Sequence, residues 1–245
     1  MGRARAHTRA ALGSLTGGME RWVGRLATVT LDTATTRAWI SEIAAAVQAE
    51  RDYLTQLDAA IGDADHGANL DRGFSAVRAK LGETAPASPG AVLGLVGRTL
   101  ISTVGGASGP LYGTVFREMA KSLGDADEVS AEQLVAALRA GLDGVRRLGA
   151  ANEGDKTMVD AFTPAVTAFD ESARTGHPIA AAAKSAAHAA EEGARATVPL
   201  EARKGRASYL GPRSVGHQDP GATSTALVFA ALQRAIERAP NSPRS

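Results

Sequence analysis

Apolar residues recur at steps of three and four positions through most of this chain. This spacing places them on one face of an α-helix. The first such series runs from Ile40 to Ile61 and predicts one long amphipathic helix that stops at Gly62. No segment shows a convincing strand pattern, so the chain is expected to be an all-α protein of about eight helices.

Turn residues and capping signals divide the rest of the pattern. Ser130 and Gln133 form a candidate capping box ahead of an apolar series. Asp219 followed by Pro220 is a candidate cap and first turn of the last helix. The further helices are expected near residues 69–81, 92–104, 111–123, 134–145, 158–169, 179–196 and 222–238.

The helical pattern indicates one domain over residues 36–238, since no repeat or linker divides it. Residues 1–35 form an N-terminal extension, rich in arginine at its start, that is expected to be partly disordered. Met19 is a second candidate for the start of the chain. Residues 239–245 are expected to form a loose tail.

Composition narrows the class of protein. Alanine is abundant and aromatic residues make up 4% of the chain, which favours close-packed helices. The balance of 27 basic and 26 acidic residues gives no argument for a nucleic-acid or membrane partner. The absence of cysteine excludes disulfides and thiol chemistry and fits a cytoplasmic protein. No apolar run approaches the roughly 18 residues of a spanning helix.

Three carboxylates, Asp58, Asp63 and Asp65, lie around one short turn. Such a cluster stays ionised only with a cation among its oxygens, and hard oxygen ligands suit magnesium. An EF-hand calcium loop is excluded, because the position that needs a glutamate is Phe74. The simpler alternative is a helix end capped by aspartates beside a polar turn.

Glycine-rich turns lie at residues 105–109, 154–158 and 204–223. Two of them lead into helix starts, where unpaired N–H groups bind anions such as phosphate. They do not form a Walker A loop, since no Gly-Lys-Ser/Thr follows. Arg206 and Lys156 could supply the positive charge of a phosphate site, or each could be an ordinary solvated cation.

Four segments together resemble the nucleotide-binding L subunits of dihydroxyacetone kinases. The most specific are Asp-x4-Asp-x-Asp-His-Gly from Asp58, Gly-Arg-Ala-Ser-Tyr-Leu-Gly from Gly205, and Gly-His-Gln-Asp-Pro-Gly-Ala-Thr from Gly216. The resemblance covers roughly residues 36–234. It departs from the family pattern at Pro212 and in the N-terminal extension.

The resemblance implies a barrel of eight antiparallel helices with ADP or ATP bound in the loops at one end. It implies two magnesium ions on Asp58, Asp63 and Asp65, and a catalytic role for Arg206 beside the transferred phosphate. The implied nucleotide contacts are His66, Gly67, Ala68, Asn69, Ala107, Ser108, Gly149, Met158, Arg206, Asp219, Pro220 and Gly221.

The resemblance also implies a phosphotransferase that works only with a partner. A separate K subunit holds dihydroxyacetone through a histidine, so neither His66 nor His217 is expected to be that nucleophile. A third, phosphotransferase-system M subunit that rephosphorylates bound ADP, free exchange of ATP, and a homodimer all stay open. Three alternatives for the function also stay open: a kinase for another small ketose such as erythrulose, a related lipid-handling kinase, and a regulatory module that senses nucleotide.

Overall fold

The computed structural model describes residues 30–240 of the protein. Met19, most of the expected extension and most of the expected tail lie outside these residues. The first described elements begin at Leu31 and Thr33, a few residues before the expected domain boundary at residue 36.

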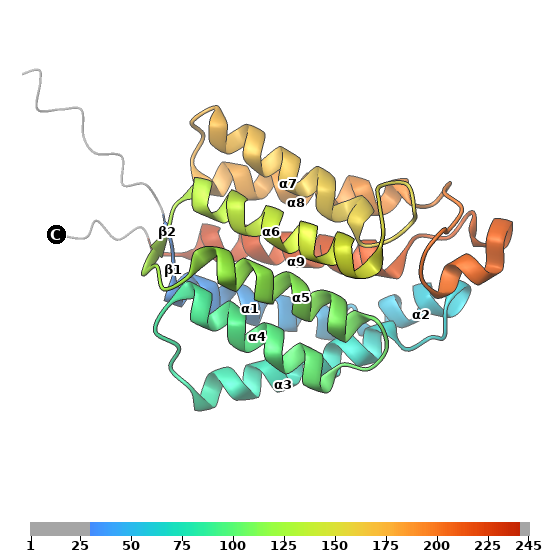
Figure 1. Ribbon diagram of the computed structural model, residues 1–245, viewed down its shortest axis with the longest axis horizontal. Helices are drawn as coiled ribbons and strands as arrows, with labels where there is room; N and C mark the ends of the chain where they lie inside the picture. Colours follow the sequence, from blue (N-terminus) through green and yellow to red (C-terminus); the bar gives the residue numbers. More distant parts are fainter. Residues whose placement is uncertain (1–29, 241–245) are drawn as a thin grey trace, which may run out of the picture.

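The described residues are mostly helical, which confirms the all-α character of the prediction, with nine α-helices and one 3-10 helix where about eight helices were expected (Figure 1). Two short antiparallel strands, β1 (Leu31–Asp32) and β2 (Glu128–Val129), are the exception within this part of the chain. The helices are α1 (Thr33–Ala49), α2 (Arg51–Ile61), α3 (His66–Glu83), α4 (Pro89–Thr103), α5 (Ser108–Leu123), α6 (Ala131–Gly149), α7 (Val159–Arg174), α8 (Ile179–Ala196), the 3-10 helix η1 (Arg206–Ser214) and α9 (Pro220–Arg238).

The prediction of one long helix over residues 40–61 was wrong, because the chain breaks at Glu50 into α1 and α2. Glu50 ends α1 with φ −96° and ψ 9°, and its N–H donates to Ala46 O. The apolar stripe has a gap at this point, since Glu50 and Arg51 are both exposed where the next buried pair would fall. Helix α2 is therefore free to turn toward other neighbours than α1.

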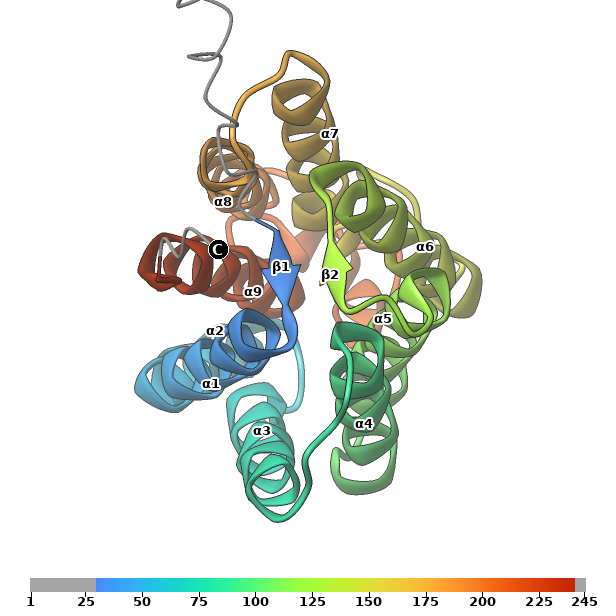
Figure 2. The same ribbon diagram turned by 90° about the vertical axis from the view of Figure 1, so that its left-hand side faces the viewer.

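The long helices pack in a circuit that closes on itself. From α3 to α9, each helix packs against the next one in the chain. Helix α1 closes the circuit, because it contacts both α9 and α3. The view along the helices shows this arrangement around a common interior (Figure 2). Helix α2 lies outside the circuit, against α3, α9 and η1.

Aromatic and glycine residues fix this packing. Trp39 of α1 meets Phe116 of α5 edge-on, and its ring N–H donates to Val228 O of α9 at 3.0 Å. Helices α4 and α5 approach closely at Gly97 and Gly113, where a Cβ on Gly97 would lie 2.7 Å from Gly113 O. The interior between the helices is thus filled by closely packed side chains.

The two ends of the molecule differ. The β1–β2 pair lies at one end, while α2, η1 and the loops before α3, α5 and α7 lie at the other (Figure 1). The glycine-rich segments 105–109, 154–158 and 204–223 therefore lie at the same end of the molecule, as the family resemblance implied. Within residues 30–240, no helix combines the length and apolar character needed to cross a membrane.

Candidate functional site

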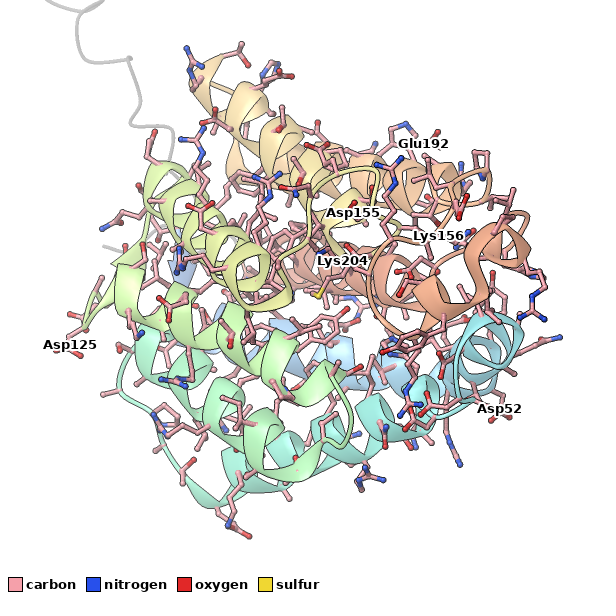
Figure 3. All side chains as sticks on the ribbon, turned by 45° about the vertical axis from the view of Figure 1, so that its right-hand side comes forward. Asp52, Asp125, Asp155, Lys156, Glu192 and Lys204 are labelled. Atoms are coloured by element: carbon pink, nitrogen blue, oxygen red, sulfur yellow. The ribbon has the colours of Figure 1, made fainter. Side chains whose placement is uncertain are left out.

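A cavity of about 400 Å³ opens among the loops at the end formed by α2 and η1. Segments far apart in sequence line it, and Figure 3 shows two of its residues, Lys156 and Lys204, in this region. Of the residues singled out from the sequence, the cavity is lined by Asp58, Asp63, Asp65, His66, Ala107, Ser108, Gly149, Lys156, Met158, Arg206, Asp219, Pro220 and Gly221.

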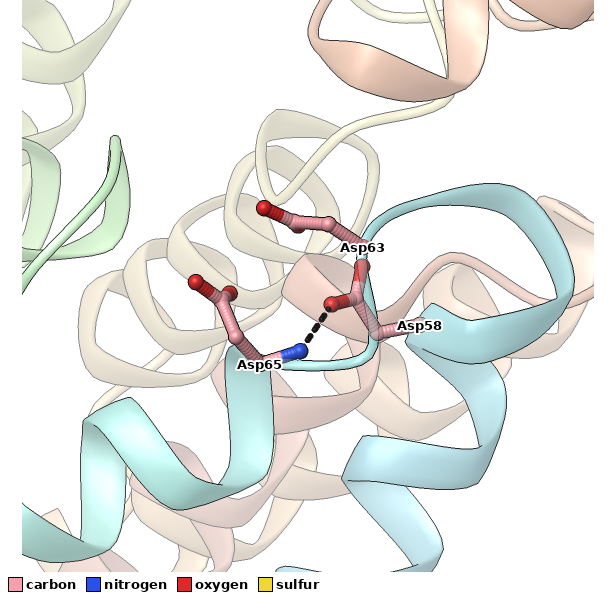
Figure 4. Close-up of side chains that lie close together, drawn as sticks. All are labelled: Asp58, Asp63 and Asp65. Atoms are coloured by element: carbon pink, nitrogen blue, oxygen red, sulfur yellow. Dashed lines mark hydrogen bonds between the residues drawn. The ribbon is translucent and has the colours of Figure 1, made fainter.

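The carboxylates of Asp58, Asp63 and Asp65 converge at this cavity (Figure 4). Each offers an oxygen, and these atoms lie within 4.8 Å of one another. Asp58 Oδ2 accepts the backbone N–H groups of Asp65, at 2.9 Å, and His66, at 3.2 Å. These bonds hold the buried carboxylate still, so that its other oxygen can serve a cation.

The turn between α2 and α3 is shaped closely around Asp58. A Cβ on Gly62 would lie 2.1 Å from Asp58 Oδ1, so only glycine fits there without displacing the carboxylate. Ala64 has a φ of 60°, a left-handed conformation that non-glycine residues rarely adopt. Three hard oxygen ligands on a fixed turn fit a magnesium site by the chemistry of the donors.

Arg206 lies at the start of η1, over the carboxylate cluster. Its Nη2 forms an ion pair with Asp63 Oδ2 at 3.0 Å. Gly205, with φ 66°, supplies the left-handed conformation that turns the chain at this point. The structure therefore places a guanidinium at the cavity, paired with a carboxylate of the cluster.

Lys156 is neither a solvated surface cation nor a free positive charge for phosphate, the two roles that its sequence context suggested. Its side chain is 1% exposed, so the interpretation as a solvated cation was wrong. Lys156 is part of the cavity lining, but its Nζ donates to backbone carbonyls, so its charge is already held by these oxygens. Burial holds the pKa of Lys156 below its usual value, although Asp219 opposes this shift.

His66 joins two helix starts through its ring. Nδ1 lies 3.1 Å from Ser108 Oγ at the start of α5, and Nε2 lies 2.9 Å from Ser224 Oγ in α9. Burial lowers the pKa of His66, while the charges of Asp58 and Asp65 act in the opposite direction. A neutral ring that bridges two hydroxyls orients the Ser108 hydroxyl at the cavity wall.

Tyr112 and Ser224 complete this network and were not identified from the sequence. The Tyr112 hydroxyl lies 2.7 Å from Ser224 Oγ and 3.0 Å from Thr225 Oγ1. Burial raises the pKa of Tyr112 to about 12, so its hydroxyl stays uncharged. The run of polar residues Thr223 to Thr225 inside a helix was the available signal, because buried hydroxyls need partners.

The start of α9 faces the cavity and is capped by Asp219. The Asp219 carboxylate accepts the Ala222 N–H at 2.7 Å, and its own N–H donates to Thr197 Oγ1 at 2.9 Å. Burial raises the pKa of Asp219 to about 7, and the negative charges of Asp160 and Asp58 add to the shift. Pro220 and Gly221 follow at the cavity wall, where the helix start favours an anion.

Gly67, Ala68 and Asn69 do not line the cavity. Gly67 packs against α2, since a Cβ there would lie 2.0 Å from Arg51 O. Asn69 is buried, and its Oδ1 accepts a hydrogen bond from Arg72 at 2.7 Å. The apolar wall of the cavity was not identified in advance and includes Leu111, Val145 and Leu148.

The fold and the site define a mostly helical domain with a carboxylate cluster at the mouth of a loop-lined cavity. Residues 60–234 match the model of the DAK2 domain, and the chain belongs to this family.

Named proteins resemble it over most of its length. The ADP-binding subunit DhaL of the PEP-dependent dihydroxyacetone kinase of Escherichia coli (strain K12) is 45% identical over 199 residues, which cover 81% of this chain and 95% of that protein. The corresponding subunit DhaL of kinase 1 of Listeria innocua serovar 6a is 42% identical over 194 residues, covering 79% and 92%.

A solved structure shares the fold. The dihydroxyacetone kinase from C. freundii in complex with AMP-PNP and Mg2+ aligns with a TM-score of 0.63 and 25% identity. The alignment covers 95% of this chain and 38% of that longer chain.

Proposed function

We propose that this protein is the ADP/ATP-binding subunit of a dihydroxyacetone kinase and presents the phosphoryl donor to a triose held by a K-type partner subunit. The observation that carries this proposal is the cluster of Asp58, Asp63 and Asp65, with Arg206 paired to it, at the mouth of a cavity. The names of the relatives support it, since two of them are ADP-binding subunits.

The cavity has one region suited to the phosphates of a nucleotide and another suited to its base. The starts of α5 and α9, at Ser108 and Pro220, offer backbone N–H groups and partial positive charge to phosphates. The apolar wall of Leu111, Val145 and Leu148 suits the face of a purine base.

Asp58, Asp63 and Asp65 would hold the metal, which we propose to be two magnesium ions. Held by these carboxylates, magnesium would supply positive charge to offset that of the phosphates. Arg206 supplies a planar guanidinium to the phosphate that is transferred. The Asp58 carboxylate is kept in place by the N–H groups of Asp65 and His66, and this fixes the site before the nucleotide arrives.

The chain offers no suitable histidine for holding the triose within its described residues. His66 is buried between Ser108 and Ser224, and the other described histidines, which are all exposed, are not part of the cavity lining: His177, His188 and His217. A partner subunit therefore supplies that function. Since two relatives are named PEP-dependent kinase subunits, we propose that this chain also works with a third subunit that rephosphorylates bound ADP, and that it does so in the cytoplasm.

The closed circuit of α1 and α3 to α9 supports the finer description of the fold as a barrel of eight antiparallel helices with the nucleotide at one mouth. In this description α2 and η1 form the rim of the mouth.

Calorimetry of ADP binding with and without magnesium tests the proposal, together with a coupled assay that contains a K-type subunit and dihydroxyacetone. We expect ADP binding to depend on magnesium. We expect phosphorylation of dihydroxyacetone only when this chain and the K-type subunit are both present. A chain that bound no ADP in the presence of magnesium would contradict the proposed function.

A further inference from the structure

Lys156 has an unusual environment for a charged side chain. It is 1% exposed, and its Nζ lies among four backbone carbonyl oxygens. The distances are 3.0 Å to Thr197 O, 3.0 Å to Leu200 O, 2.7 Å to Ser214 O and 2.5 Å to His217 O. An ammonium has three protons, so these four carbonyl dipoles surround the charge and share its protons.

The four carbonyls belong to one segment, residues 197–217, which begins at the end of α8 and approaches the start of α9. Apart from η1 this segment has no regular helix or strand. Few bonds other than those of Lys156 close it. Among them, Gly216 N–H donates to Val198 O at 2.8 Å, and Ala202 N–H donates to Ser214 Oγ at 2.9 Å.

Burying an ammonium costs free energy unless dipoles or charges replace the water. Lys156 also adopts a φ of 63°, a left-handed conformation that L side chains rarely take. The free-energy costs of burying the ammonium and of the left-handed backbone conformation are offset only if the carbonyls stay around Nζ. The segment 197–217 is therefore held in one shape by a cation at its centre, as carbonyl rings hold ions elsewhere.

This segment contributes two cationic side chains to the cavity. Lys204 and Arg206 lie in it and line the cavity, while Thr157 and Met158, next to Lys156 in the chain, line another part of the wall. Arg203 N–H also donates to Asp155 O at 3.0 Å, tying the two strands of chain together just before Lys204. A displacement of the segment would move Arg206 away from Asp63.

We propose that Lys156 is a positioning residue whose ammonium acts as a fixed internal cation: it organises residues 197–217 and so places Arg206 at the phosphate-transfer site. The first part of this proposal, that Lys156 organises the segment, is inferred from the hydrogen bonds of its Nζ and does not depend on the function of the protein. The effect on transfer rests on the proposed kinase function.

The test compares the full chain with the variants Lys156→Ala and Lys156→Met. The alanine variant leaves a space with the shape of a propyl chain that ends among the four carbonyls, and n-propylammonium is the probe for this space. Methionine fills the apolar part of the space without a charge. Lys184→Met, at an exposed lysine on α8, is the matched control.

Hydrogen exchange provides a measurement that does not need nucleotide. We expect the amides of Arg203 and Gly216 to exchange at least about tenfold faster in both Lys156 variants, with the amides of α4 and α5 unchanged. Addition of n-propylammonium should restore slow exchange in Lys156→Ala but not in Lys156→Met. Neither n-propanol nor tetramethylammonium should do so, because the first lacks charge and the second cannot donate hydrogen bonds.

Single-turnover transfer with a K-type partner then measures the consequence for the site. We expect a fall of about 100-fold or more in Lys156→Ala with a smaller loss of ADP affinity, and recovery of transfer with n-propylammonium. Unchanged exchange, failed restoration by n-propylammonium, or loss of the whole fold in both variants would overturn the proposal. Absence of ADP binding by the unmodified chain would instead contradict the kinase function, while the exchange experiment would still decide the role of Lys156.

Discussion

The guanidinium of Arg206 and the carboxylate of Asp63 form an ion pair, with 3.0 Å between Nη2 and Oδ2. The pair joins η1 to the turn between α2 and α3, two segments more than 140 positions apart in the chain. The Arg206 side chain is 68% exposed, and an exposed pair of this kind contributes little to stability. Arg206 can therefore exchange Asp63 for a phosphate at small cost.

From this arrangement we predict that Arg206→Ala lowers phosphoryl transfer by roughly 10³-fold or more, as for arginines in other transfer sites. Nucleotide affinity should fall much less, because the metal carboxylates and the helix starts still hold the ground state. Lysine should restore little, since it lacks the planar set of donors. Single-turnover transfer with the partner subunit and ADP affinity are measured on the same variant.

Arg213→Ala is the control for this prediction. Arg213 lies in the same element, η1, is exposed, and does not line the cavity. Its removal should leave both transfer and affinity unchanged. Equal losses of transfer and of affinity in Arg206→Ala would show that Arg206 is a binding residue without a particular role in the transition state.

A second prediction concerns the metal. Asp63→Ala removes one of three carboxylates whose oxygens lie within 4.8 Å of one another, so the remaining pair should hold magnesium poorly. Tight ADP binding should be lost in calorimetry while helical circular dichroism stays largely intact, because Asp63 is exposed on a turn. Asp125→Ala, at an exposed carboxylate distant from this turn, should bind as the unmodified chain does (Figure 3).

The metal assignment has a direct counter-test. If Asp63→Ala kept its affinity for ADP in the absence of magnesium, the cluster would not be a metal site. The alternative, three aspartates that only cap a turn, would then explain the bonds from Asp65 N–H and His66 N–H to Asp58.

A third prediction is that the purified chain alone does not phosphorylate dihydroxyacetone at a useful rate. The side chains that line the cavity serve an anion and a cation, and no second constellation among the described residues offers a covalent site for a carbonyl. A coupled assay with and without a K-type subunit measures this. Robust turnover by the isolated chain would contradict the proposal that a separate K-type subunit binds the triose.

The sequence predicted most helices because their apolar residues repeat at the helical period, which is a local property. The capping box at Ser130 and Gln133 and the cap at Asp219 were identified for the same reason, and the structure contains both. The break at Glu50 was missed, although the apolar stripe is interrupted there.

The site was predictable only in part. Asp58 lies near the end of α2, and Asp63 and Asp65 lie in the turn that follows, so their convergence followed from the short distance in sequence. The carbonyl shell of Lys156 and the network of His66, Ser224 and Tyr112 join residues from separate elements. Such contacts depend on how the helices pack, and no single segment of sequence carries that information.

The last prediction follows from Asp219. Burial raises the pKa of its carboxyl from 3.8 to about 7 in the folded protein. The folded state therefore binds this proton more tightly than the unfolded state does. The resulting stabilisation is fully present below about pH 4 and is lost as the pH rises toward 7.

Asp219→Asn should remove this dependence. An asparagine can still accept the Ala222 N–H and cap α9, but it cannot ionise. We expect the unfolding free energies of the two proteins to be similar near pH 4, and the variant to be more stable at pH 8 by as much as a few kcal/mol, since one pKa unit corresponds to about 1.4 kcal/mol.

Urea unfolding of the chain without nucleotide or metal, at intervals from pH 4 to pH 8, measures the difference between variant and unmodified protein. Asp125→Asn serves as control, because this exposed carboxylate lies in a loop on the surface and should give a difference that does not change with pH. A flat difference for Asp219→Asn would show that the buried carboxyl ionises normally. A difference that grows with pH would identify Asp219 as a group kept partly neutral near pH 7 by its burial beside Asp58 and Asp160.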